Sequence, residues 1–165
     1  MASAPHRVLL VDESALVRQN VRSMLESCSE LSVIGEAESG IEAVSMTSYI
    51  IRPDVIVMDI NMPGMNGIEA TRHIKAAQPA ILVIGFSVND DPHVQEAMRG
   101  ASADAFLAKG AASTQLCDAI AALAHQGRVE RIDQGWQKTR MATTPWLYSK
   151  TDSTGGRTAR RVQSW

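Results

Sequence analysis

The chain has 165 residues, of which 45% are hydrophobic and 21% are charged, and its net charge is −2. This length suits one domain with a single core and an appendage, and it is too short for two domains of full size. No apolar run approaches the roughly 20 residues of a membrane span, and the N-terminus lacks the apolar segment of a signal peptide, so we expect a cytoplasmic protein with no membrane segment.

Five short apolar runs recur through the first 127 residues. They are Val8–Val11, Leu31–Ile34, Val55–Met58, Ile81–Ile84 and Ala105–Ala108. Nearly unbroken runs of Val, Ile, Leu and Met suit the strands of a parallel sheet that is covered on both faces. The sequence therefore predicts five buried strands.

The segments between these runs have the spacing of helices. Apolar residues recur there at i, i+3 or i+4 and i+7, which gives each helix one apolar stripe. Residues that commonly begin or end helices agree with this, namely Ser14 and Ser39 before the first and second helices and Gly100 and Gly127 at the ends of the fourth and fifth. Alternating strands and helices predict an α/β fold of the form (βα)₅, with a doubly wound five-stranded parallel sheet.

Polar residues follow the predicted strands at the points where those strands end. They are Asp12 and Glu13 after the first run, Asp59 after the third, Ser87 after the fourth and Lys109 after the fifth. The carboxyl ends of parallel strands meet at one edge of such a sheet, where ligands bind. We therefore expect these side chains to gather in one pocket.

Three carboxylates in one pocket repel each other by a few kcal/mol per pair at an effective dielectric near 20 unless a cation offsets their charge. Oxygen ligands without Cys or His favour Mg²⁺ over zinc. A metal, the ammonium of Lys109 and the hydroxyl of Ser87 together could hold three phosphoryl oxygens. The attacking atom would then be a carboxylate oxygen of Asp59.

Several motifs at these positions resemble the receiver domain of bacterial two-component response regulators. They are VLLVDE, PDVIVMDINMPGMNGIEATRHIK, the serine after IGF, and ADAFLAKGA, and the resemblance covers about residues 6–127. The segments ESALVRQNVRSMLE and VIGEAESGIEAV also resemble the NarL/FixJ branch of that family. The resemblance implies the flavodoxin-like receiver fold for 1–127, followed by a tail at 128–165.

Carried over residue by residue, the resemblance assigns a role to each matching position. It implies Mg²⁺ binding by Asp12, Glu13, Asp59 and the backbone carbonyl of Asn61, phosphorylation at Asp59, a phosphoryl contact from Lys109, and switch roles for Ser87 and Phe106. The implied partners are a sensor histidine kinase or phosphotransfer protein, with a possible homodimer through the receiver. Apart from its own phosphorylation and dephosphorylation at Asp59, the domain is not expected to be an enzyme.

The sequence of the tail does not decide what the receiver controls. Residues 128–165 contain eight Lys and Arg against three Asp and Glu, whereas residues 1–127 contain eight against fifteen. A basic tail with tryptophans could bind nucleic acid, or it could be a linker or extension that docks on the receiver or a partner. Two functions follow: a stand-alone interaction module switched by phosphorylation, or a DNA-binding transcription regulator of the NarL/FixJ type with a truncated or atypical output region.

The two cysteines, Cys28 and Cys117, are far apart in the sequence, and each lies in a helical pattern. Their spacing matches neither a disulfide framework nor a metal site. We expect both to be small hydrophobic residues of the core.

Overall fold

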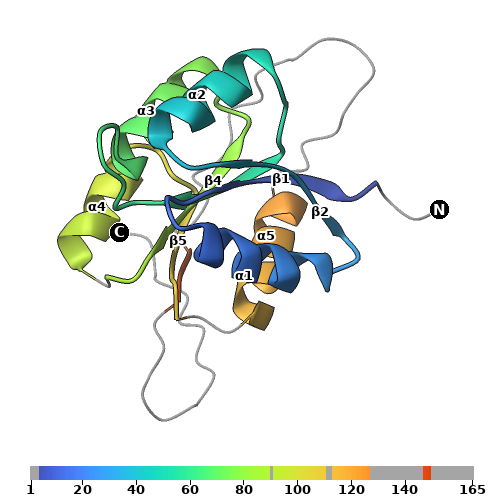
Figure 1. The fold of residues 1–165 in the computed structure, drawn as a ribbon. Helices are drawn as coiled ribbons and strands as arrows, with labels where there is room; N and C mark the ends of the chain where they lie inside the picture. The colour runs from blue at the N-terminus through green and yellow to red at the C-terminus, as the bar shows by residue number, and fades with distance from the viewer. Residues whose placement is uncertain (1–3, 90, 111–112, 127–146, 150–165) are drawn as a thin grey trace.

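The computed structural model describes residues 4–89, 91–110, 113–126 and 147–149, and for 113–114, 125–126 and 147–149 it describes the backbone alone. Its centre is a parallel sheet with the strand order β2-β1-β3-β4-β5-β6 (Figure 1). The strands are β1 (His6–Val11), β2 (Leu31–Ala37), β3 (Val55–Asp59), β4 (Leu82–Ser87), β5 (Ala105–Ala108) and β6 (Leu147–Ser149). The helices are α1 (Ala15–Glu26), α2 (Gly40–Tyr49), α3 (Gly67–Ala77), α4 (Pro92–Gly100) and α5 (Ser113–Gln126).

Helices cover both faces of the sheet. α1 and α5 lie on one face, and α2, α3 and α4 lie on the other (Figure 1). Alternate residues of β1 therefore enter two different cores: Val8 and Leu10 belong to the cluster under α1 and α5, whereas Leu9 and Val11 belong to the opposite cluster. Both faces of the central strands β1 and β3 are buried, which explains the continuous apolar runs Val8–Val11 and Val55–Met58. The predicted doubly wound α/β fold is confirmed, and β1 lies between β2 and β3, where the strand order reverses.

The local signals for helix ends were mostly correct. The Ser14 hydroxyl accepts a hydrogen bond from the backbone N–H of Val17 at 3.4 Å, and the Ser39 hydroxyl accepts one from Glu42 at 3.2 Å. Gly100 is the last residue of α4, while Gly127 lies outside the described residues. These caps satisfy backbone donors in the first turn, which have no partner within the helix.

Several strand predictions differ from the structure. β1 begins at His6, before the predicted run Val8–Val11, and β2 continues to Ala37, beyond the predicted end at Ile34. The fourth strand begins at Leu82 and continues through Gly85 to Ser87, where the sequence predicted Ile81–Ile84. In addition, β6 extends the sheet beyond the five predicted strands: it pairs in parallel with β5, with Phe106 opposite Tyr148. Its three residues lie in the tail and are too few to show a periodic pattern.

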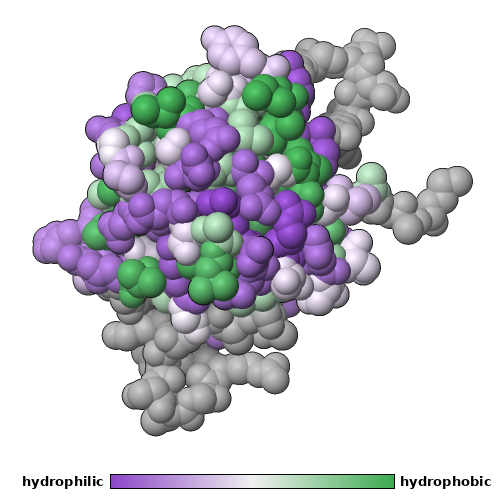
Figure 2. Space-filling view, viewed as in Figure 1, coloured by the Kyte–Doolittle hydropathy of each residue, from purple (hydrophilic) through white to green (hydrophobic). Residues whose placement is uncertain are grey.

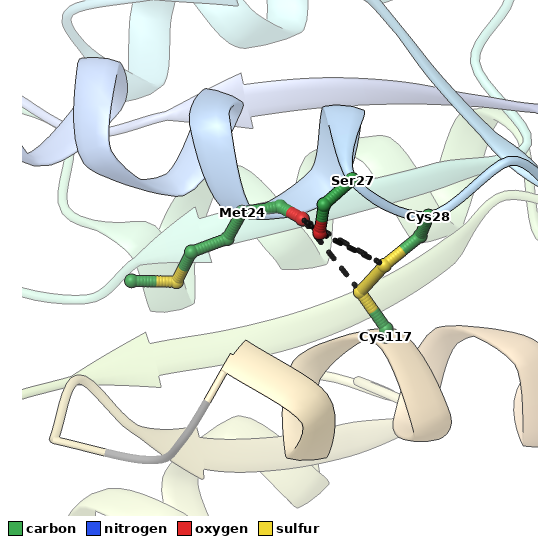
Figure 3. The surroundings of a disulfide bond; sticks show 4 residues. All are labelled: Met24, Ser27, Cys28 and Cys117. Atoms are coloured by element: carbon green, nitrogen blue, oxygen red, sulfur yellow. Dashed lines mark hydrogen bonds between the residues drawn. A yellow bond between two sulfur atoms is a disulfide. The ribbon is translucent and has the colours of Figure 1, made fainter.

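The expectation for the two cysteines was wrong, because Cys28 and Cys117 form a disulfide (Figure 3). Their Cα atoms are 6.6 Å apart, and the bond ties the end of α1 to α5. These helices are far apart in the sequence but pack side by side on the same face of the sheet. This proximity depends on the topology, so cysteine spacing alone could not reveal it.

The surface seen in Figure 2 is largely hydrophilic, with apolar residues in separate patches. Among the residues whose side chains are described, the exposed large hydrophobic residues are Leu16, Ile41, Tyr49, Ile50 and Val88. Among the described residues, no helix combines the length and apolar character needed to cross a bilayer.

Candidate phosphoryl-transfer site

Four predicted site residues lie at the carboxyl edge of the sheet. Asp12 follows β1, Asp59 ends β3, Ser87 ends β4, and Lys109 follows β5. These strands are neighbours in the sheet, so the residues occupy consecutive positions along its edge. The topology therefore assembles groups that are separated by almost one hundred residues in the chain.

Lys109 connects the two buried carboxylates. Its Nζ lies 2.6 Å from Asp12 Oδ2 and 3.0 Å from Asp59 Oδ1. The Lys109 side chain is 15% exposed, and those of Asp12 and Asp59 are 6% and 4% exposed. The backbone N–H of Lys109 donates to the Ser87 carbonyl at 2.7 Å, which fixes the start of the lysine side chain beside β4.

Burial dominates the electrostatics of Asp59. It raises the pKa of the Asp59 carboxyl, and the nearby Asp12 charge raises it further, while Lys109 and the Asn61 N–H oppose this change. For Lys109, burial alone would lower the pKa, but the hydrogen bonds to Asp12 and Asp59 outweigh burial and raise it. The ammonium therefore remains charged between two carboxylates, and one positive charge does not neutralise both of them.

Backbone groups hold the two carboxylates in place. The Ser14 N–H donates to Asp12 Oδ1 at 2.9 Å, and the Asn61 N–H donates to Asp59 Oδ1 at 3.3 Å. Arg18 also donates to the Asp12 backbone carbonyl at 2.7 Å and to Glu36 at 2.9 Å. Sequence reasoning missed Arg18, since an arginine in the first turns of an amphipathic helix looks like an ordinary surface residue.

Ser87 is fully buried, and its hydroxyl contacts one residue that follows its own strand β4 and one that follows the neighbouring strand β3. It accepts hydrogen bonds from the Asn89 N–H at 3.1 Å and from the Asn61 side-chain amide at 3.5 Å. Ser87 is thus linked to the loop after Asp59. A shift of this loop would change the contact between Asn61 and the Ser87 hydroxyl.

Phe106 lies on β5, three residues before Lys109, and is fully buried. It belongs to the core cluster that contains Met98 of α4. It also packs against Gly85, where an added Cβ would lie 3.2 Å from Phe106 Cδ2. In this structure the aromatic ring is therefore part of the core.

The loop after Asp59 depends on two glycines for different reasons. Gly64 has φ +74°, a left-handed conformation that other residues rarely adopt. At Gly67, an added Cβ would lie 2.0 Å from the Asp59 backbone oxygen. The first turn of α3 therefore approaches the end of β3 more closely than any other residue type allows.

The predicted metal ligands are only partly brought together. Glu13 is exposed, and among the described residues no group of three or more His, Cys, Asp and Glu side chains is placed to hold a metal ion. The remaining set still fits Mg²⁺, which binds through one or two carboxylates together with water and phosphate oxygens. Asp12 and Asp59 supply two buried carboxylates that a single lysine leaves with excess negative charge.

Comparison with known proteins shows the family of this chain. Residues 8–121 match the family described as the response regulator receiver domain. The chain belongs to this family. Receiver domains are in general signalling domains that bind Mg²⁺ and act with histidine kinases, and they are not usually enzymes.

The relatives of this receiver include regulators of the NarL/FixJ type. The chain is 36% identical over 114 residues to the response regulator GacA of Pseudomonas viridiflava, which covers 69% of this chain and 53% of GacA. It is 38% identical over 118 residues to the transcriptional regulatory protein LiaR of Bacillus subtilis, covering 70% of this chain and 54% of LiaR. This receiver thus spans about half the length of these curated relatives.

Its fold is also similar to solved receivers. The signal receiver domain of the response regulator NarL from Mycobacterium tuberculosis superposes with a TM-score of 0.70 at 27% identity, covering 74% of this chain and 98% of that structure. The expected receiver fold and family are therefore confirmed.

Proposed function

We propose that Asp59 accepts a phosphoryl group from a sensor histidine kinase or phosphotransfer protein in the cytoplasm, and that this controls association with a partner or a second copy. The observation that carries the proposal is the ion-pair arrangement of Lys109 with Asp12 and Asp59, at 2.6 and 3.0 Å. Membership of the receiver family supports the same chemistry.

In this proposal the carboxylates of Asp12 and Asp59 and the backbone carbonyl of Asn61 hold Mg²⁺, and the exposed Glu13 adds negative charge beside them. The ion supplies positive charge for the phosphoryl oxygens. Lys109 supplies a second positive charge from within the buried site, and the Ser87 hydroxyl supplies a hydrogen bond. These groups stabilise negative charge as it develops on the transferred group.

The proposed reaction forms one bond and breaks one. A carboxylate oxygen of Asp59 attacks phosphorus, and the bond between phosphorus and the donor histidine nitrogen breaks, leaving an acyl phosphate on Asp59. Lys109 keeps its proton throughout, because its two carboxylate partners raise its pKa. The neighbouring ammonium keeps the Asp59 carboxyl available as the ionised nucleophile despite burial.

We further propose that Ser87 and Phe106 convert phosphorylation into a change of surface. A phosphoryl group adds about one to two negative charges and several acceptor oxygens. The Ser87 hydroxyl, now bonded to Asn61 and Asn89, can exchange these contacts for a phosphoryl oxygen. Phe106 lies on β5, the strand next to β4, and belongs to the same core cluster as Met98 of α4. A movement of the Phe106 ring would therefore be passed to α4 and change the surface that this helix presents.

A second candidate function is DNA-binding transcription regulation. It is favoured by the similarity to LiaR, a transcriptional regulatory protein, and by the coverage of only 54% of its length. The basic tail at 128–165, apart from β6, lies outside the described residues. In this alternative the receiver would control an output region that is truncated or atypical.

The central claim can be tested by intact mass after incubation with acetyl phosphate and Mg²⁺. We expect the native protein to gain one phosphoryl group, the Asp59→Asn variant to stay unmodified, and the Asp118→Asn variant, which changes an exposed aspartate on α5, to behave as native. A native protein of unchanged mass would refute the proposal.

Size-exclusion and DNA-shift assays with beryllium fluoride and Mg²⁺ then distinguish the two candidate functions. Dimerisation without DNA binding favours the interaction module.

A further inference from the structure

The Cys28–Cys117 disulfide opens onto the surface. Both cysteines are half-buried, and both line a pocket of about 280 Å³ at the end of α1. Attack on a disulfide needs access for the incoming sulfur along the S–S bond. A pocket that is lined by both bonded cysteines gives a small molecule this access without unfolding of the domain.

The surroundings of the bond also suit the reduced state. The Met24 carbonyl oxygen lies 3.7 Å from Cys28 Sγ and 3.9 Å from Cys117 Sγ (Figure 3). The Ser27 hydroxyl donates to the same oxygen at 2.6 Å. After reduction, both thiols lie near this carbonyl oxygen and, being half-buried, can also face the pocket, so the dithiol is not enclosed by apolar groups alone.

The charge of the pocket restricts which thiols can enter. Glu30 and Asp118 line it, and none of its described lining residues is Lys, Arg or His. Two carboxylates repel an anionic thiol and attract one that carries an ammonium group, and the effect weakens as salt shortens the Debye length.

We propose that Cys28–Cys117 is a reversible thiol–disulfide exchange site for small thiols that carry an ammonium group. An incoming thiolate attacks one sulfur of the pair, forms a mixed disulfide, and releases the other cysteine as a thiolate that takes up a proton. A second small thiolate then attacks the mixed disulfide. The small thiols leave as their own disulfide, and the protein is reduced to two thiols. The reverse sequence uses the small disulfide as the oxidant.

This site is separate from the proposed phosphorylation site. The Leu31 N–H at the start of β2 donates to the Cys28 carbonyl, so Cys28 lies at the amino-terminal edge of the sheet. Asp59 ends β3 at the opposite edge. Disulfides are rare in the cytoplasm, where those that occur are usually transient and redox-active, which agrees with exchange at an open site.

The test uses the full chain, first oxidised with cystamine and then reduced with cysteamine or with 3-mercaptopropionate at equal thiolate concentrations. The reaction is stopped by acid and alkylation, and free thiols are counted by intact mass. We expect an internal disulfide after oxidation, and a rate of reduction that is proportional to thiol and several-fold faster with cysteamine at low salt. The preference should decrease in Asp118→Asn and persist in Glu96→Gln, which changes an exposed acid on α4.

Four results would each overturn the proposal. The first is the absence of an internal disulfide after cystamine treatment, with both cysteines either free or each bound to its own cysteamine. The second is a reduction rate independent of thiol concentration, because it would show that the domain must open first. The third is equal or faster reduction by 3-mercaptopropionate. The fourth is an Asp118→Asn variant that keeps the native preference.

Discussion

Removing the charge of Asp59 should stabilise the domain at neutral pH. Burial and the Asp12 charge raise the pKa of Asp59 in the folded protein, so the folded state releases this proton at a higher pH than the unfolded chain does. The stability that the protonated group contributes is fully present below the unfolded pKa, near 3.9, and is lost as pH rises through the raised folded pKa. At pH 7 the ionised carboxylate therefore costs stability, and Asp59→Asn removes this cost.

The expected gain is small because opposing interactions nearly balance. The Asp59 side chain is only 4% exposed, but Lys109 lies 3.0 Å from it and offsets part of the desolvation. Because these interactions oppose each other, we expect a gain near the lower end of the roughly 0.5–3 kcal/mol by which single substitutions change the free energy of unfolding, or roughly 2–8 °C in Tm. Lys109 keeps its ion pair with Asp12 at 2.6 Å in the variant.

Urea and thermal unfolding of native protein, Asp59→Asn and the control Asp118→Asn, without divalent cations, will measure this difference. The gain should be present at pH 7 and should shrink near pH 4. Addition of Mg²⁺ should stabilise the native protein more than Asp59→Asn, because the variant lacks one of the two buried carboxylates. A variant less stable than native at pH 7, or a gain that is the same at both pH values, would refute this reasoning.

Three further predictions test other parts of the structure by urea unfolding. Lys109→Met leaves two buried carboxylates without their cation, so it should cost about 3 kcal/mol, and Mg²⁺ should restore part of this loss. Gly67→Ala places a Cβ 2.0 Å from a carbonyl oxygen of β3 and should cost roughly 1–3 kcal/mol, whereas Gly100→Ala, where a Cβ meets nothing within 4 Å, should not destabilise. Replacing both Cys28 and Cys117 by Ser removes a cross-link across a sequence separation of 89, which should cost roughly 4–5 kcal/mol relative to the oxidised protein.

The strands of the receiver were predictable because burial on both faces leaves an unambiguous signal. Val55–Met58 is apolar throughout, and it lies within β3 with every residue buried. The fourth strand was placed too early because its second half is Gly85-Phe86-Ser87, which has no continuous apolar character. Gly85 is needed there since Met98 and Phe106 fill the space that a side chain would occupy.

The candidate site was predictable to the extent that sheet topology determines it. Asp12 and Asp59 end neighbouring strands, so their approach follows from the strand order, and Lys109 reaches both of them. Topology does not determine the direction of a side chain in the loop beyond a strand. Glu13 is one residue farther along than Asp12 and is exposed, although the sequence grouped the two as equal members of an acidic pair.

Two contacts between distant elements gave no sequence signal. The disulfide needs α1 and α5 to lie side by side, and β6 needs the tail to return to β5. Neither follows from helical spacing or strand composition. The sequence predicted α1 and α5 separately, and it left the residues of β6 unassigned.

The disulfide also has a defined relation to the candidate site through the two helices that it joins. α1 begins three residues after Asp12, where the Ser14 N–H holds the Asp12 carboxylate, and α5 begins four residues after Lys109. The bond therefore ties together the two helices whose starts flank the Asp12–Lys109 ion pair, but it does so at the far end of α1. Since Lys109 and Asp12 are held locally by the Ser87 carbonyl and the Ser14 N–H, reduction should lower global stability much more than it changes the geometry of that ion pair.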